Sequence, residues 1–99
     1  MDALPEETAL RVRMTALART FPSTRNAPGV DPWRADLVEE WAKGPISDGE
    51  RMTARFLLSV WDPRLAWELD PFDVMEALKV WSLSHHEAFL RWARKPWWP

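Results

Sequence analysis

Apolar side chains recur every three or four residues along most of the chain, which is the spacing of one face of an α-helix. The first such run consists of Leu10, Met14, Leu17 and Phe21. Pro5 precedes it and suits the first position of a helix, where no N–H is needed. We therefore predict a first helix over about residues 5–20, ended by Phe21–Pro22. Residues 22–30 show no periodicity and contain two prolines, so we predict a loop there.

Three Asp–Pro pairs punctuate the rest of the chain: Asp31–Pro32, Asp62–Pro63 and Asp70–Pro71. Each predicts a helix start, because aspartate is a strong N-cap and proline fits the next position. The first pair predicts a helix over about residues 32–43. The second predicts one or two turns around Leu65, Trp67 and Leu69, and the third a longer helix that begins at Pro71.

Two further segments have the capping-box pattern, in which a serine and a glutamate three residues later bond each other's backbone N–H. Ser47 and Glu50 predict a helix over about residues 48–61. Ser84 and Glu87 form the second pair. The apolar spacing alone allows one helix from 71 to 95, but this second box favours two helices joined by a tight bend.

These elements predict an all-α fold, a single-domain bundle of four to six short helices over residues 1–99, with a tail at 96–99. The chain has no cysteine, which excludes disulfides, thiolate catalysis and cysteine-ligated zinc. No apolar run approaches the roughly 20 residues of a membrane span, and the acidic N-terminus is unlike a signal peptide. We expect a cytoplasmic protein without membrane contact. Its many arginines and few amides are typical of a GC-rich bacterial genome.

Eight of the 99 residues are tryptophan, and each indole, when buried, removes about 150–250 Å² from water. Four of them fall on the apolar stripes of the predicted helices and are expected in the core: Trp41, Trp61, Trp81 and Trp92. Trp33 and Trp67 follow Asp–Pro pairs, so we expect them to pack at the starts of helices.

Trp97 and Trp98 lie beyond the last predicted helix and cannot belong to its stripe. The tail either folds back over the bundle or projects toward a partner. Folding back is favoured, because an exposed pair of indoles in a small protein promotes association. Tryptophan and arginine are the commonest interface anchors, so we predict a partner-binding surface formed by Arg91, Arg94, Trp97 and Trp98.

The sequence offers little for catalysis or metal binding. Adjacent His85 and His86 point about 100° apart on a helix and cannot chelate one ion together, so we expect no metal and no cofactor. One histidine is expected to pack on the bundle and the other to face solvent. The serines lack a nucleophile-elbow motif, and the glycines form no phosphate loop. We therefore expect a protein that is not an enzyme.

Charge is unevenly distributed, although the net charge is only −2. Residues 31–50 are acidic, whereas residues 1–30 carry four arginines and residues 88–99 carry three bases and no acidic side chain. The acidic middle argues against a protein that wraps a nucleic acid. Our hypothesis is a non-enzymatic protein-interaction module, a small bacterial adaptor or regulator, that binds a protein partner or a second copy of itself. The alternative is a nucleic-acid-binding, helix-turn-helix-like regulator.

Overall fold

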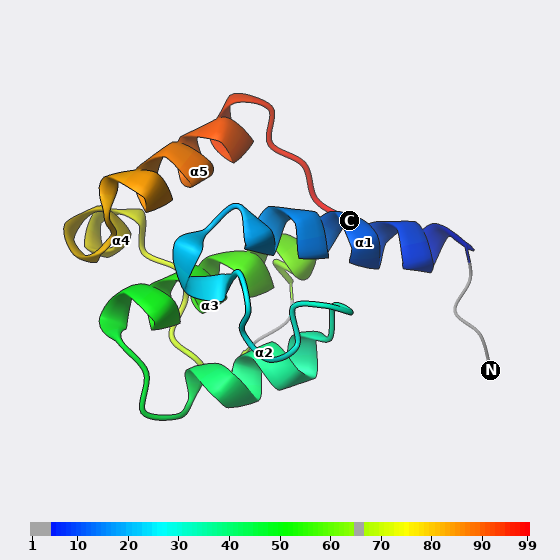
Figure 1. Cartoon of the computed structure of the whole chain (residues 1–99), viewed down its shortest axis with the longest axis horizontal. Helices are drawn as coiled ribbons and strands as arrows, with labels where there is room; N and C mark the ends of the chain where they lie inside the picture. Colours follow the sequence, from blue (N-terminus) through cyan, green and yellow to red (C-terminus); the bar gives the residue numbers. More distant parts are fainter. Residues whose placement is uncertain (1–4, 65–66) are drawn as a thin grey trace.

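The computed structural model describes residues 5–64 and 67–99 of the chain, and within these ranges the regular structure is entirely helical (Figure 1). The elements are α1 (Pro5–Arg19), the 3-10 helix η1 (Pro22–Thr24), α2 (Ala35–Ala42), α3 (Asp48–Trp61), α4 (Val74–Val80) and α5 (Leu83–Arg94). The predicted helical bundle is therefore confirmed. Its radius of gyration of 12.8 Å agrees with the about 13 Å expected for 100 folded residues. In the ranges described, no helix combines the length and the apolar character needed to cross a membrane.

Helix α3 lies at the centre, between α1 and α2 in Figure 1. The predicted capping box starts it: the Ser47 hydroxyl accepts from the N–H of Glu50 at 3.1 Å, and the Glu50 carboxylate accepts from the N–H of Ser47 at 2.9 Å. After Asp48, every residue of α3 is buried or half-buried. The other helices therefore pack around α3, which supplies the core residues Met52, Ala54, Phe56, Leu57, Leu58 and Val60.

The first Asp–Pro pair does not start a helix, contrary to the prediction. Asp31 and Pro32 lie in a turn, and α2 begins only at Ala35. Between them Trp33 is turned into the core and has no exposed surface, so it does not merely pack at the start of a helix. The turn is closed by the N–H of Arg34, which donates to the carbonyl of Gly29 at 2.7 Å. Burial of this indole outweighs the local preference of Asp–Pro for a helix start.

The second Asp–Pro pair is also not followed by a helix in the described residues, and Leu65 lies outside them. The segment is instead tied to α2 and α3. The indole Nε1 of Trp67 donates to the carbonyl of Leu58 at 3.2 Å, and Glu68 accepts from Lys43 at 2.7 Å. These side-chain bonds hold Trp67 and Glu68 against α3 and the end of α2. The hydrogen bond to Glu68 also raises the pKa of Lys43.

The third Asp–Pro pair predicts a helix that begins at Pro71, but the helix in the structure begins three residues later. Helix α4 begins at Val74, and Asp73 caps it by accepting from the N–H groups of Met75 and Glu76 at 3.0 and 3.1 Å. Phe72, predicted to lie in the helix, instead packs its ring against Phe56 with centroids 5.3 Å apart. This packing keeps residues 70–73 out of the helix and leaves Asp73 as the N-cap.

The predicted pair of helices joined by a bend is confirmed, but the bend lies at Trp81–Ser82 and the predicted box at Ser84 is wrong. Helix α5 begins at Leu83, so Ser84 is already inside it. Trp81 is buried at the bend, and its Nε1 donates to the Thr53 hydroxyl of α3 at 2.9 Å. Anchoring of this indole fixes the position of the bend.

Aromatic rings connect α5 to the rest of the bundle. Neighbouring ring centroids lie 5.1–6.4 Å apart in a cluster formed by Phe21, Phe56, Phe72, Trp81, Phe89 and Trp92. Of the four tryptophans predicted in the core, Trp81 is buried. The other three, Trp41, Trp61 and Trp92, are half-buried and pack against the core. Helix α5 therefore has an inner side packed by large side chains and an outer side that this cluster does not cover.

Candidate interaction surface

The structure places the four predicted partner-binding residues in two settings. Arg91 and Arg94 lie in the last turns of α5 and are exposed. Trp97 is half-buried, and Trp98 keeps 52% of its surface accessible. Only part of the predicted surface is therefore open to a partner.

The C-terminal tail folds back over the bundle, toward α1 (Figure 1). The indole Nε1 of Trp92 donates to the carbonyl of Trp97 at 3.2 Å. The guanidinium carbon of Arg13 lies 3.9 Å from the centroid of the Trp97 ring. Trp98 meets Trp92 edge to face, with centroids 5.4 Å apart. Trp97 thus serves an internal contact, while Trp98 remains available on one side.

An apolar ridge on the outer side of α5 was not predicted. The inner side of this helix holds the buried residues His85 and Ala88. Leu83 and Leu90 lie seven residues apart, which is about two helical turns, on the opposite side. Their exposed fractions are 77% and 52%. These two leucines therefore form an exposed ridge on the side of α5 that faces away from the core.

The ridge continues onto α4 through His86. On the helix surface this residue lies between Leu83, three residues before it, and Leu90, four residues after it. Its ring Nε2 is 3.0 Å from the carbonyl oxygen of Leu78 at the end of α4, close enough for the ring N–H to donate. Exposed apolar side chains thus extend over both helices. The α4–α5 outer face is defined by Val74, Met75, Leu78, Leu83 and Leu90.

Exposed charges of opposite sign gather at two places on α4 and α5. Exposed acids gather at the start of α4 and just before it, namely Asp70, Asp73 and Glu76. Exposed bases gather at the end of α5, namely Arg91, Arg94 and Lys95. Lys79 and Glu87 lie between these two groups. The acids border the groove between α3 and α4, where Asp70 lies 3.6 Å from Arg55 and Glu76 lines a pocket against α3, whereas the bases lie beside the outer ridge of α5.

The inner side of α5 carries a polar network centred on His85, which sequence reasoning did not connect to Ser23. The imidazole Nε2 contacts the Ser23 hydroxyl and accepts from the Ser23 N–H at 3.3 Å. The Nδ1 atom is 2.8 Å from the Ser82 hydroxyl, so the ring proton is assigned to Nδ1. Burial, aided by the charge of His86, lowers the pKa of His85 and keeps the ring neutral at pH 7.

This network joins three helices. Ser23 lies in the first turn of η1, where a backbone N–H lacks a helical partner, and His85 supplies the acceptor. The Ser23 hydroxyl also lies 3.2 Å from that of Thr53, which donates to the carbonyl of Gly49 in α3. His85 therefore acts as a cap and a cross-link between η1, α3 and α5. One histidine packs on the bundle as predicted, and it is His85; the other, His86, was expected to face solvent and is half-buried at the surface.

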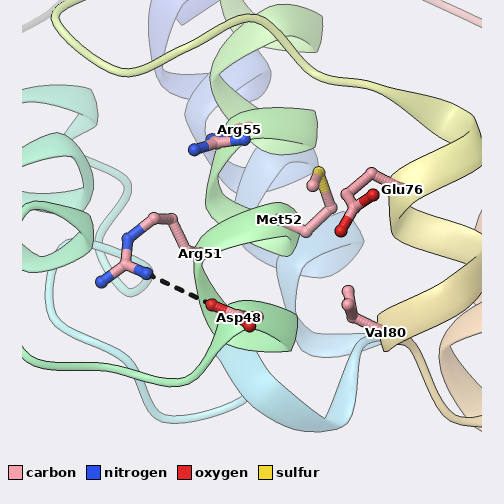
Figure 2. Close-up of a pocket in the computed structure, with 6 residues that line it drawn as sticks. All are labelled: Asp48, Arg51, Met52, Arg55, Glu76 and Val80. Atoms are coloured by element: carbon pink, nitrogen blue, oxygen red, sulfur yellow. Dashed lines mark ion pairs between the residues drawn. The ribbon is translucent and has the colours of Figure 1, made fainter.

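A pocket lies between α3 and α4, lined by Asp48, Arg51, Met52, Arg55, Glu76 and Val80 (Figure 2). Its volume of about 180 Å³ is below the roughly 300–1,000 Å³ of typical small-molecule sites. Arg51 lies 3.7 Å from Asp48 there, and its side chain is committed to the end of α2, where it donates to the carbonyls of Ala42 and Gly44. The pocket thus offers little room for a ligand, and the charge of Arg51 is already engaged.

Arg55 is the most enclosed cation at this side of α3. Its Nε atom is buried and finds no acceptor among the described residues, and its nearest carboxylate is that of Asp70 at 3.6 Å.

Within the same described ranges, no group of three or more acidic, histidine or cysteine side chains converges to hold a metal ion. Comparison of the chain with protein-family models, with curated proteins and with solved structures found no match.

Proposed function

We propose that this protein is a non-enzymatic protein-interaction module, a small adaptor or regulator, that binds through the α4–α5 outer face. The observation that carries the proposal is the exposure of Leu83 and Leu90 on a helix whose opposite side is packed into the core. More than half of the surface of each leucine lies outside the packed core of this chain. Contiguous exposed apolar patches with a polar rim are typical of protein-binding surfaces.

Residues beside this face fit the anatomy of an interface. Covering a leucine stabilises a complex by about 1.5–3 kcal/mol before the cost of association is subtracted. Arg91 and Arg94 lie at the rim, where charge governs orientation and association rate more than affinity. Trp98, about half exposed, provides an aromatic anchor at the same end. These roles retain Arg91, Arg94 and Trp98 from the predicted partner-binding surface.

The nucleic-acid-binding alternative has weaker support. Two arginines of α1 are engaged within the chain, because Arg11 bonds Glu7 and the carbonyl of Trp33, and Arg19 bonds Asp31. A helix-turn-helix needs a second helix that can enter the major groove. In the α2–α3 pair that helix would be α3, in which every residue after Asp48 is buried or half-buried.

The experiment that tests this proposal is site-specific photo-crosslinking. A photoreactive amino acid is placed at Leu83 or at Leu90, and adducts are identified after irradiation in the cells that make the protein. Val12 is the matched control, since it is 65% exposed but lies on α1. We expect a discrete protein adduct from both leucine positions and none from Val12. Absence of adducts from either leucine position, or equal labelling from Val12, would contradict the proposal.

A further inference from the structure

We infer that the partner of the outer ridge of α5 is an amphipathic helix of another protein, whose apolar row is flanked by acidic side chains. This inference rests on the proposed function and names the chemistry of the partner. It is carried by three features of α5: two exposed leucines at helical spacing, two arginines without an ion-pair partner among the described residues, and a small hollow beside them.

The spacing of the exposed leucines favours a helix as the partner. Leu83 and Leu90 lie seven residues apart, on one line along α5. Apolar residues at this spacing on two helices pack side by side, with the helix axes about 8–10 Å apart. The line is narrow, because Ser84, Glu87 and Arg91 flank it on one side. An amphipathic helix presents an apolar row of matching length and width.

The bases at the end of this line make an acidic partner the complementary one. Arg91 and Arg94 are exposed in the last turn of α5, and Lys95 follows as its C-cap. None of the three forms an ion pair within the described part of the chain, whereas Arg11 and Arg19 of α1 each pair with an acid. Guanidinium groups form strong, often bidentate, hydrogen bonds with carboxylates.

A hollow on the outer side of α5 gives an acidic side chain a place to bind. Its volume is about 230 Å³, and it is lined by Glu87, Leu90, Arg91 and Arg94. Typical small-molecule sites measure roughly 300–1,000 Å³, so this hollow suits one side chain of a larger partner. A carboxylate bound there meets two guanidinium groups, while the carbons of the same side chain cover part of Leu90.

Glu87 narrows the class of partner. It lies on the exposed side of α5 between Leu83 and Leu90, and it has no ion-pair partner among the residues that the structure describes. An anionic lipid surface or a row of nucleic-acid phosphates places negative charge against this carboxylate, which is unfavourable. A helix instead offers a neutral or basic side chain opposite Glu87 and an acidic one two turns further on, opposite Arg94.

Fluorescence anisotropy with the purified full chain and labelled probes tests the inference. One probe is a covalently stapled helix with leucine every seven residues and glutamate beside the leucines. The second probe has lysine in place of each glutamate. We expect the glutamate probe to bind with a micromolar dissociation constant, as transient interfaces do, and the lysine probe to bind at least tenfold more weakly. Phosphatidylglycerol vesicles and duplex DNA should not bind at about 0.15 M salt.

Charge reversal tests the role of the bases. Arg94→Glu should weaken binding of the glutamate probe at least tenfold and strengthen binding of the lysine probe, because it exchanges attraction for repulsion. Arg64→Glu is the matched control, since it changes the net charge equally but lies in the turn after α3, where the side chain is 94% exposed. It should alter neither dissociation constant by more than about twofold.

Two further variants test the leucine line and Glu87. Leu83→Asp should weaken binding of the glutamate probe at least tenfold, because it places a charge in an apolar contact. It leaves the fold intact, since Leu83 is 77% exposed and an acid suits the first turn of α5. Glu87→Gln should strengthen binding of the glutamate probe about twofold, because it removes a like charge at the surface.

Each contrary result has a distinct meaning. Equal binding of the two probes, or a preference for the lysine probe, overturns the acidic partner, as does tighter binding of vesicles or DNA. Equal weakening by Arg64→Glu and Arg94→Glu assigns the binding to net charge and also overturns it. If neither probe binds at about 1 mM, the inference fails, and crosslinks from Leu83 and Leu90 to a protein sustain the proposed function alone. Absence of both probe binding and crosslinks overturns both.

Discussion

The guanidinium of Arg13 lies over the indole of Trp97, with its central carbon 3.9 Å from the ring centroid. This contact joins the middle of α1 to the tail that follows α5. The start of α5 is held separately, by Trp81 and His85 at the bend. Helix α5 is thus fixed at both ends, and its outer ridge is held in a constant position.

Removing the Arg13–Trp97 contact should destabilise the fold. We expect Trp97→Ala to lower the free energy of unfolding by about 1–2 kcal/mol, because half of a large aromatic surface is uncovered. For a domain of this size that corresponds to a fall in melting temperature of about 4–8 °C per kcal/mol. Thermal unfolding followed by circular dichroism measures it.

A double-mutant cycle separates the cation–π contact from general packing. Arg13→Ala and Trp97→Ala should couple by about 0.5–1 kcal/mol. Arg91→Ala serves as the control, because Arg91 lies on α5 and the guanidinium over the Trp97 ring is that of Arg13. A coupling energy near zero for Arg13 and Trp97 would mean that their stacking contributes nothing.

The two serines that the sequence marks as helix caps should behave differently. Ser47→Ala removes a hydroxyl that accepts from the N–H of Glu50, and should cost about 1 kcal/mol of stability. Ser84→Ala alters an exposed position inside α5 and should change stability by less than about 0.5 kcal/mol. Urea midpoints of the two variants provide the comparison. Equal costs would contradict the assignment of only one of these residues as a cap.

Trp33 should be the most sensitive of the tryptophans. It is fully buried, and its ring packs against that of Trp61 with centroids 5.8 Å apart. Trp33→Ala should cost about 3–5 kcal/mol, a large share of the stability of a small domain. Trp33→Phe should cost no more than about 2 kcal/mol, because it also removes a buried N–H that finds no acceptor in the described part of the chain. Chemical denaturation of both variants tests this order.

Stability should depend on pH through His85. Burial lowers the pKa of this ring in the folded state, so the unfolded chain binds the proton more tightly. The free energy of unfolding should therefore be constant above about pH 6.5 and fall as the pH drops below it. The loss should level off once the pH passes below the depressed folded pKa.

His85→Gln should remove most of this pH dependence, because glutamine does not titrate. His86→Gln is the matched control and should retain most of it, since burial of His85 is the larger cause of the shift. Urea denaturation between about pH 5 and pH 8 measures both slopes. A slope that survives His85→Gln unchanged would assign the titration to another group.

Local patterns in the sequence predicted α1 and α3 well. The capping box of Ser47 and Glu50 is a contact between residues three apart, so its signal lies within one short segment. The Asp–Pro pairs are equally local, yet none of them starts a helix in the described residues. At each, a neighbouring aromatic ring has a distant partner: Trp33 packs on Trp61, Trp67 bonds Leu58 and Phe72 packs on Phe56. Tertiary burial therefore overrode the local preference.

The candidate surface was predicted only in part for a related reason. Leu78 belongs to the same periodic apolar run as Val74 and Trp81, and periodicity does not show how far a core extends. Leu83 and Leu90 form an outer ridge only because Trp81 and His85 hold the opposite side of α5 against the bundle. The link between His85 and Ser23 spans 62 residues and leaves no local signature.

The enclosure of α3 also determines where the molecule opens. Helix α3 packs against α1, α2, α4 and η1, so we expect exchange of its amide protons with solvent to require global unfolding. Those of α5 are covered on one side only and exchange through a smaller, local detachment. A partner seated on the outer ridge would suppress that detachment, so amide protection in α5 would rise on binding while protection in α3 stayed constant.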